Sequence, residues 1–373
     1  MNFNTYKKVF NCKLSTASSI ARFEHDSSDY QHLKYKNGLS LVSLENDSNI
    51  VKLSVIHCAG SKHETDENYG ITHRIRQSAY LGCKDISYFS LNRILQQLGG
   101  NLSIQTDREF IIYNLTCLRE NLPKLSKCLF ESAFNPGFKS WEIRDSAKFL
   151  KFDLEKHEKN IDSLLYEGIH TAAFRNEALG NSLFSTNYKY DSFNTEQMQK
   201  YIQSHYSNNN TAIFGDGISQ TDLIHLCQEN GQIETFHNFS DITTEKTTDI
   251  TKNFIEPKSK YFGGSLRLGF DCDTVYAIVA GKANSPGTVY SLKGAINQLL
   301  LSYIISPPNR VKYSTNYNYP IGKLVAESTN LPYLVENFIS IYSDQALVGF
   351  SVAVDQKDIE PVIYFINYNQ TYI

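Results

Sequence analysis

The sequence lacks a long apolar run and a marked excess of either charge. No stretch reaches the roughly 20 apolar residues that a bilayer-spanning helix needs, and the longest candidate, Leu299–Ile305, is soon followed by Pro307 and Pro308. Any membrane attachment therefore has to go through partners. The formal net charge is −3, which argues against the basic face of a dedicated nucleic-acid-binding protein.

The sequence also lacks paired cysteines. Its seven cysteines are widely scattered, and no two of them form a CxxC motif. An odd, dispersed set argues against a disulfide framework and against a zinc site made of cysteines. We expect buried thiols in a reducing compartment. Neither a G-x-S-x-G motif nor a phosphate-binding P-loop is present in the sequence.

What is present is enough apolar material for a folded core. Hydrophobic residues make up 41% of the 373 residues and charged residues 20%, so the chain is not a disordered polyampholyte. At the usual domain size, this length corresponds to about two or three domains.

The first residues have the composition of a targeting signal. Residues 1–23 contain four basic residues and many hydroxyl residues, and no acidic residue occurs before Glu24. Their apolar positions advance by three or four residues, as on one face of a helix. These features are typical of a mitochondrial presequence, which we expect over residues 1–24. A disordered basic tail with accidental periodicity is the alternative.

Local patterns predict several strands and helices. Runs of alternating or β-branched residues predict strands at Leu39–Leu44 and Ile50–Ala59, and two more within Asn101–Leu118 around a turn at Asp107-Arg108. Gly99-Gly100 predicts the end of a helix. The predicted helices cover His73–Leu81, Leu91–Leu98, Leu122–Ala133 and one long polar helix, Ser140–Ala173.

The chain contains a weak internal repeat. Residues 102–115 read LSIQTDREFIIYNL and residues 339–352 read ISIYSDQALVGFSV, at an offset of 237 residues. A strand–strand–helix order upstream of the second segment (Ser265–Gly281, then Val289–Ile305) matches the order upstream of the first. A tandem duplication explains both observations, although two unrelated hairpins would share such alternation.

The repeat suggests two domains. Residues 241–260 are rich in Thr, Lys, Asp and Glu, which predicts an exposed linker. We expect a first domain over 33–240 and a second over 261–373. At this offset the second copy stops opposite Pro136, so the second domain is expected to be incomplete. Part of its apolar face would then need a partner or would leave the domain poorly stable.

One stretch carries the chemistry. Residues 59–81, AGSKHETDENYGITHRIRQSAYL, resemble the pitrilysin-type (inverzincin) peptidase family M16. Its active members carry H-x-x-E-H on a helix at this point. The two histidines hold Zn²⁺ on one helix face, the glutamate activates the metal-bound water, and a downstream glutamate is the third ligand. The resemblance implies an α+β fold of tandem LuxS/MPP-like domains, each with a mostly antiparallel sheet and helices on one face, around a cavity.

The zinc motif is degenerate in this chain. His73 keeps the first ligand position, Arg76 stands at the base position and Gln77 at the second histidine. The third ligand position falls on Asp153. Arginine cannot accept a proton, and glutamine is a poor zinc ligand compared with imidazole. The resemblance therefore implies no catalytic residue, no bound metal and no other cofactor, and we expect Arg76 to pair with Asp153.

Other stretches extend the resemblance over about residues 33–373. The family includes the mitochondrial processing peptidase and the two core proteins of respiratory complex III. The alpha subunit of the processing peptidase also lacks the zinc motif but has a glycine-rich loop, whereas Ser302–Tyr313 contains no glycine. This difference favours the core-protein branch. The additional matching stretches are Leu41–Asn46, Asp107–Glu109, Ser140–Ile143, His170–Gly180 and Asn209–Ile218.

The core-protein branch implies a structural role. The chain would be a non-catalytic subunit on the matrix side of the mitochondrial inner membrane, supporting assembly of ubiquinol–cytochrome c reductase. Its partners would be core protein 1, cytochrome b, cytochrome c1 and the iron–sulfur protein. Three alternatives stay open: a presequence-binding alpha-type subunit of the processing peptidase, an active metallopeptidase with atypical ligands, and a paralogue or truncated isoform that assembles with nothing.

Overall fold

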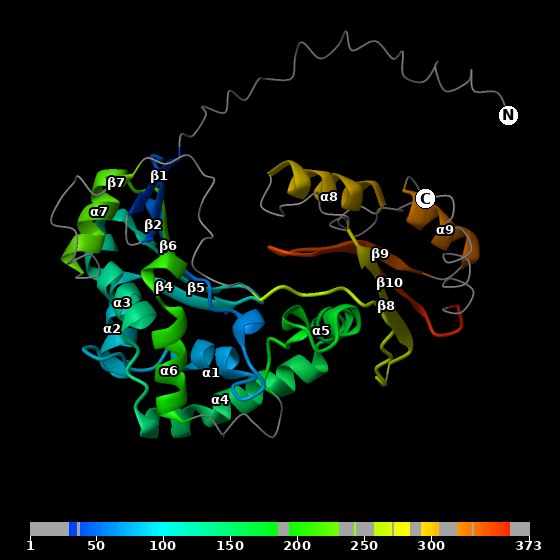
Figure 1. The fold of residues 1–373 in the computed structure, drawn as a ribbon, viewed down its shortest axis with the longest axis horizontal. Coiled ribbons are helices and arrows are strands. Elements are labelled where there is room, and N and C mark those ends of the chain that lie inside the picture. Colours follow the sequence, from blue (N-terminus) through cyan, green and yellow to red (C-terminus); the bar gives the residue numbers. More distant parts are fainter. Residues whose placement is uncertain are drawn as a thin grey trace, which may run out of the picture.

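A computed structural model describes the chain over residues 30–35, 38–185, 194–230, 242–243, 257–270, 272–283, 292–305, 319–329 and 332–358 (Figure 1). The predicted presequence, most of the predicted linker 241–260 and most of the glycine-free segment 302–313 lie outside these residues. Of the helices within the described ranges, none is both long enough and apolar enough to cross a membrane.

The secondary structure alternates between strands and helices along the chain, as the α+β prediction requires. The strands are β1 (Gln31–Tyr35), β2 (Ser40–Leu44), β3 (Ile50–His57), β4 (Asn101–Thr106), β5 (Ile111–Leu118), β6 (Thr211–Asp216), β7 (Ile242–Thr243), β8 (Thr274–Lys282), β9 (Leu334–Ile341) and β10 (Ala346–Asp355). The helices are α1 (Ile71–Ser78), α2 (Tyr88–Leu98), α3 (Leu122–Phe134), α4 (Ser140–Lys159), α5 (Ile161–Phe174), α6 (Thr195–His205), α7 (Gln220–Glu229), α8 (Leu292–Ile305) and α9 (Pro320–Ser328).

The first sheet has the strand order β4-β5-β3-β6-β2-β1-β7 among the described residues. All its pairs are antiparallel except β2 with β6, so the mostly antiparallel sheet is confirmed. The predicted strands at 39–44 and 50–59 are present as β2 and β3, but β6 lies between them. Because β7 pairs with β1 at the sheet edge, residues 242–243 of the predicted linker belong to this sheet.

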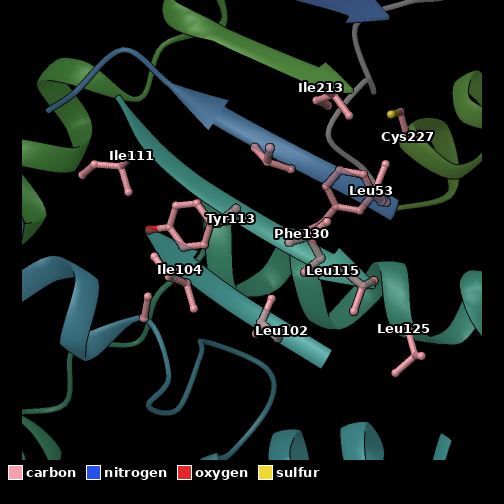
Figure 2. Close-up of a cluster of buried hydrophobic side chains, with 14 of the residues drawn as sticks. Leu53, Leu102, Ile104, Ile111, Tyr113, Leu115, Leu125, Phe130, Ile213 and Cys227 are labelled. Atoms are coloured by element: carbon pink, nitrogen blue, oxygen red, sulfur yellow. The ribbon is translucent and has the colours of Figure 1, made fainter. Parts of the chain in front are cut away.

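One face of the first sheet forms the main core (Figure 2). Along β5, Tyr113 and Leu115 are fully buried, whereas Asn114 between them is only half-buried. Alternate side chains of a strand point to opposite faces, so the buried set faces the helices. From α3, Leu125 and Phe130 pack into the same cluster. Each such side chain stabilises the fold by about 1.5–3 kcal/mol through burial.

The predicted helix over Ser140–Ala173 is wrong as a single element, because the chain breaks at Asn160 into α4 and α5. The side-chain oxygen of Asn160 accepts hydrogen bonds from the backbone N–H groups of Asp162 and Ser163, at 3.1 and 3.3 Å. Asparagine is a favoured N-cap residue because it satisfies the free donors of a new helix. The break changes the direction of the chain between the two helices.

The second sheet has the order β8-β10-β9 and is antiparallel throughout. Both segments of the predicted repeat form hairpins, β4–β5 and β9–β10. The loop of the first hairpin begins at Asp107, and the loop of the second begins at Tyr342. The structural offset is therefore 235 residues, two fewer than the offset that aligns the sequences.

The strand predicted to start at Ser265 is absent. Residues 265–270 have no regular secondary structure, and the strand begins only at Thr274 as β8. The preceding segment lies instead against α5, where Leu266 approaches Gly168. No strand pairs with 265–270 among the described residues, so its alternating pattern has no neighbour with which to form a ladder. The helix predicted at 289–305 is present as α8.

The two sheets are joined by a shared interface. An apolar cluster combines Ala173 and Phe174 of α5 with Phe338 and Leu347 of the second sheet. A buried polar cluster lies beside it, where the two hairpin loops meet. There Lys62 Nζ lies 3.0 Å from Glu109 Oε1, and its partners in the second loop are Ser343 Oγ at 2.6 Å and Asp344 Oδ1 at 3.2 Å.

Candidate functional site

The helix α1 carries three of the four predicted site positions. It begins after Gly70, whose φ of +89° is the left-handed region that glycine adopts most easily. The carboxylate of Glu64 accepts hydrogen bonds from the backbone N–H of Gly70 at 2.8 Å and of Thr72 at 2.9 Å. A negative charge at a helix N-terminus is stabilising, so the start of α1 is firmly fixed.

The structure brings all four predicted positions together. One oxygen of Asp153 on α4, Oδ2, accepts three hydrogen bonds from α1. The donors are His73 Nε2 at 2.9 Å, Arg76 Nη2 at 2.5 Å and Gln77 Nε2 at 3.0 Å. The predicted contact between Arg76 and Asp153 is thus present, well within the 4 Å expected of an ion pair.

The hydrogen bonds of His73 define its protonation. The backbone N–H of Ser185 lies 3.2 Å from Nδ1 of His73 and donates to it. Nδ1 is therefore the acceptor, and the ring proton lies on Nε2, which points at Asp153. Gly70 makes this approach possible, because a Cβ atom there would come within 2.7 Å of the Ser185 Cβ.

Burial and charge shift the pKa values of this cluster. The hydrogen bond from His73, followed by the charge of Arg76, lowers the pKa of Asp153 to about 2, although burial acts in the opposite direction. Burial lowers the pKa of His73, and its hydrogen bond to Asp153 only partly opposes this. The cluster therefore combines an ionised carboxylate with a neutral imidazole at neutral pH.

Several residues that the sequence did not single out complete the site. The ring of Phe184 stacks on His157 at a centroid distance of 3.9 Å and lies 5.5 Å from the Arg76 guanidinium. Ser185 follows directly. Both lie only a few residues beyond the matching stretch 170–180, but nothing in their spacing pointed to α1. Contact across more than 100 residues of sequence is visible only in the folded chain.

A cavity of about 320 Å³ adjoins the cluster, lined in part by Arg76, Gln77 and Asp153. The arrangement offers hydrogen-bond donors and a fixed positive charge. It provides no neighbouring carboxylate or imidazole lone pair that is not already in a hydrogen bond with the cluster. Within the described ranges, no three His, Cys, Asp or Glu side chains gather in a group that could hold a metal ion.

The ion pair makes the stability of the fold depend on pH. We expect Asp153→Asn to lower the free energy of unfolding at pH 7 by about 2 kcal/mol, because the ordinary pKa of 3.8 is lowered to about 2. A depressed pKa stabilises the fold above the unfolded-state value, and the stabilisation disappears as the pH falls from about 4 towards 2.

Urea unfolding between pH 7 and pH 3 measures this effect. The difference between wild type and Asp153→Asn should shrink below about pH 4. Asp145→Asn is a matched control, because Asp145 lies exposed on the same helix. A difference that stays constant with pH would contradict the assignment.

The comparisons with known proteins agree with this geometry. Residues 41–187 match the model of the insulinase family, peptidase family M16. This range contains the whole four-residue cluster, and the resemblance predicted from the sequence is confirmed.

Individual relatives cover more of the chain. The mitochondrial cytochrome b-c1 complex subunit 2 of Homo sapiens is 27% identical over 337 residues, which are 90% of this chain and 70% of the relative. The corresponding subunit of Mus musculus is 25% identical over the same shares. The alpha subunit of the mitochondrial processing peptidase of Solanum tuberosum is 24% identical over 84% of this chain and 59% of its own length.

Proposed function

We propose that this chain is a non-catalytic structural subunit of mitochondrial complex III, of the subunit 2 type. The observation that carries the proposal is the hydrogen bond from Arg76, at the position of the catalytic base, to Asp153, at the position of a metal ligand. Similarity to cytochrome b-c1 complex subunit 2 over 90% of the chain supports the choice of complex.

The four side chains do not fit a zinc ion. Zinc would need a lone pair on Nε2 of His73, but that nitrogen carries the ring proton and donates to Asp153. It would also have to replace the Arg76 guanidinium beside Asp153 Oδ2 and would lie next to a permanent positive charge. Glutamine is a weak zinc ligand. These features support the loss of metallopeptidase activity.

The proposed partners are core protein 1, cytochrome b, cytochrome c1 and the iron–sulfur protein, on the matrix side of the inner membrane. The mitochondrial relatives support this location. We also propose that the two sheets belong to two M16-type domains, residues 33–240 and 261–373, with residues 241–260 between them. The separate strand orders of the two sheets are consistent with this division.

A second function is supported by a specific observation, the similarity to the alpha subunit of the processing peptidase over 84% of the chain. In that case the chain would bind presequences without cleaving them. The absence of glycine from residues 302–313 argues against this function, because a flexible backbone that approaches a peptide closely usually needs glycine.

Native gel electrophoresis of mitochondria that express a tagged chain tests the proposal. We expect the chain to migrate with cytochrome b and cytochrome c1 after extraction in mild detergent. A soluble heterodimer with a zinc peptidase would instead support the processing-peptidase function. Peptide cleavage by the purified chain that a chelator abolishes would contradict the proposed inactivity.

A further inference from the structure

The cavity beside Asp153 has an unusual charge balance. Two of the residues that line it, Arg76 and Lys156, are cations, and Asp153 is the only carboxylate among its described lining residues. Asp153 is paired with Arg76. No carboxylate lies within 4 Å of Lys156 in the described part of the chain, so its charge is not compensated locally.

Neutral groups on the opposite wall also favour an anion. Asn160 and Ser163 line the cavity at the start of α5. Because the Asn160 oxygen accepts the bonds that cap α5, its NH₂ group is the part of the side chain that can donate to a ligand. The N-terminus of a 14-residue helix carries a partial positive charge. Asp162 lines a neighbouring cavity rather than this one.

We propose that this cavity binds a small oxyanion, a phosphate or a carboxylate group, between Arg76 and Lys156 on one side and the start of α5 on the other. The substitutions that remove a cation site would thus have produced an anion site in the same place. The inference rests on the proposed absence of zinc, but it does not depend on the complex into which the chain assembles.

The geometry limits the size and type of ligand. A volume of about 320 Å³ is at the lower end of ligand pockets, which suits a ligand with few heavy atoms. An arginine donates through several N–H groups in one plane, a pattern that matches phosphate and carboxylate oxygens. Arg76 uses one nitrogen for Asp153, and the other N–H groups of a guanidinium can donate elsewhere.

Isothermal titration of the purified full chain tests the site. Inorganic phosphate and succinate are the two probes, in a low-salt buffer that contains a chelator. We expect saturable binding of at least one of them with one site per chain, and the stronger probe identifies the preferred group. Lys156→Gln should weaken the binding by at least about fivefold, as expected for loss of one charge-assisted hydrogen bond.

A matched control separates the cavity from the surface. Lys151→Gln removes an exposed charge from the same helix α4, away from the cavity, and should leave the affinity unchanged. Arg76→Gln should abolish binding, and its unfolding curve is recorded in parallel.

Two results would overturn the proposal: no saturable binding of either anion, or equal weakening by Lys151→Gln and Lys156→Gln. The zinc content of the same preparation is measured separately. Stoichiometric zinc would contradict the proposed inactivity, whereas zinc-free protein that fails to bind either anion contradicts the oxyanion site alone.

Discussion

The triple variant Arg76→Glu, Gln77→His and Asp153→Glu should gain a zinc site. It restores the ligands and the base that the M16 resemblance implies, and it removes the guanidinium that now contacts Asp153. His73 is already in place. Ser185 Oγ lies 3.2 Å from its Nδ1 and can accept the ring proton once Nε2 turns to the metal, a supporting contact typical of zinc sites.

Metal analysis and competition with a chromophoric chelator measure the gain. We expect the affinity for zinc to rise by at least about 1,000-fold, since natural zinc sites bind with apparent free energies of roughly 10 kcal/mol or more. Arg76→Glu alone is the control, because it supplies no second histidine. Wild-type protein that binds zinc as tightly as the triple variant would refute the account of the site.

Removing the buried charge of Lys62 should cause the largest loss of stability. The Lys62 side chain is 1% exposed and contacts Glu109 and Asp344. Burial lowers its pKa, but Glu109 and then Asp344 reverse this effect, so the pKa is raised overall. Lys62→Met leaves both carboxylates buried without their cation, which typically costs about 3–5 kcal/mol.

Chemical unfolding of the full chain measures this loss. Lys52→Met is the matched control, because Lys52 is exposed on β3 and its replacement should change the free energy of unfolding by less than about 0.5 kcal/mol. A loss below about 1 kcal/mol for Lys62→Met would mean that the two hairpin loops are not joined through this lysine. Replacing Glu109 by Met in the Lys62→Met background should recover part of the loss, since one unpaired charge is removed.

Local signals predicted much of the first half of the fold. The end of α2 follows from Gly99, which adopts a φ of +66°, and the β4–β5 hairpin follows from alternation around the predicted turn. The insertion of β6 between β2 and β3 was not predictable, because strand order depends on packing of segments more than 100 residues apart. The two-residue shift between the hairpins has a similar cause, since sequence identity and loop position align differently.

The site was predicted only as far as the resemblance reached. Spacing relative to the family placed His73, Arg76, Gln77 and Asp153, and the structure brings them together. The long polar helix concealed the break at Asn160, which creates one wall of the cavity. Ser185 carries no signal of its own in the sequence, because its role depends on the close approach that Gly70 allows.

The position of α5 has a consequence for biosynthesis. The ribosome releases α5 long before β9 and β10, yet Phe174 is covered by Phe338 and Leu347 from those strands. During translation this aromatic surface has no native cover, which makes it a binding surface for chaperones and a target for quality-control proteases. The completed chain hides that surface only when its last hairpin docks.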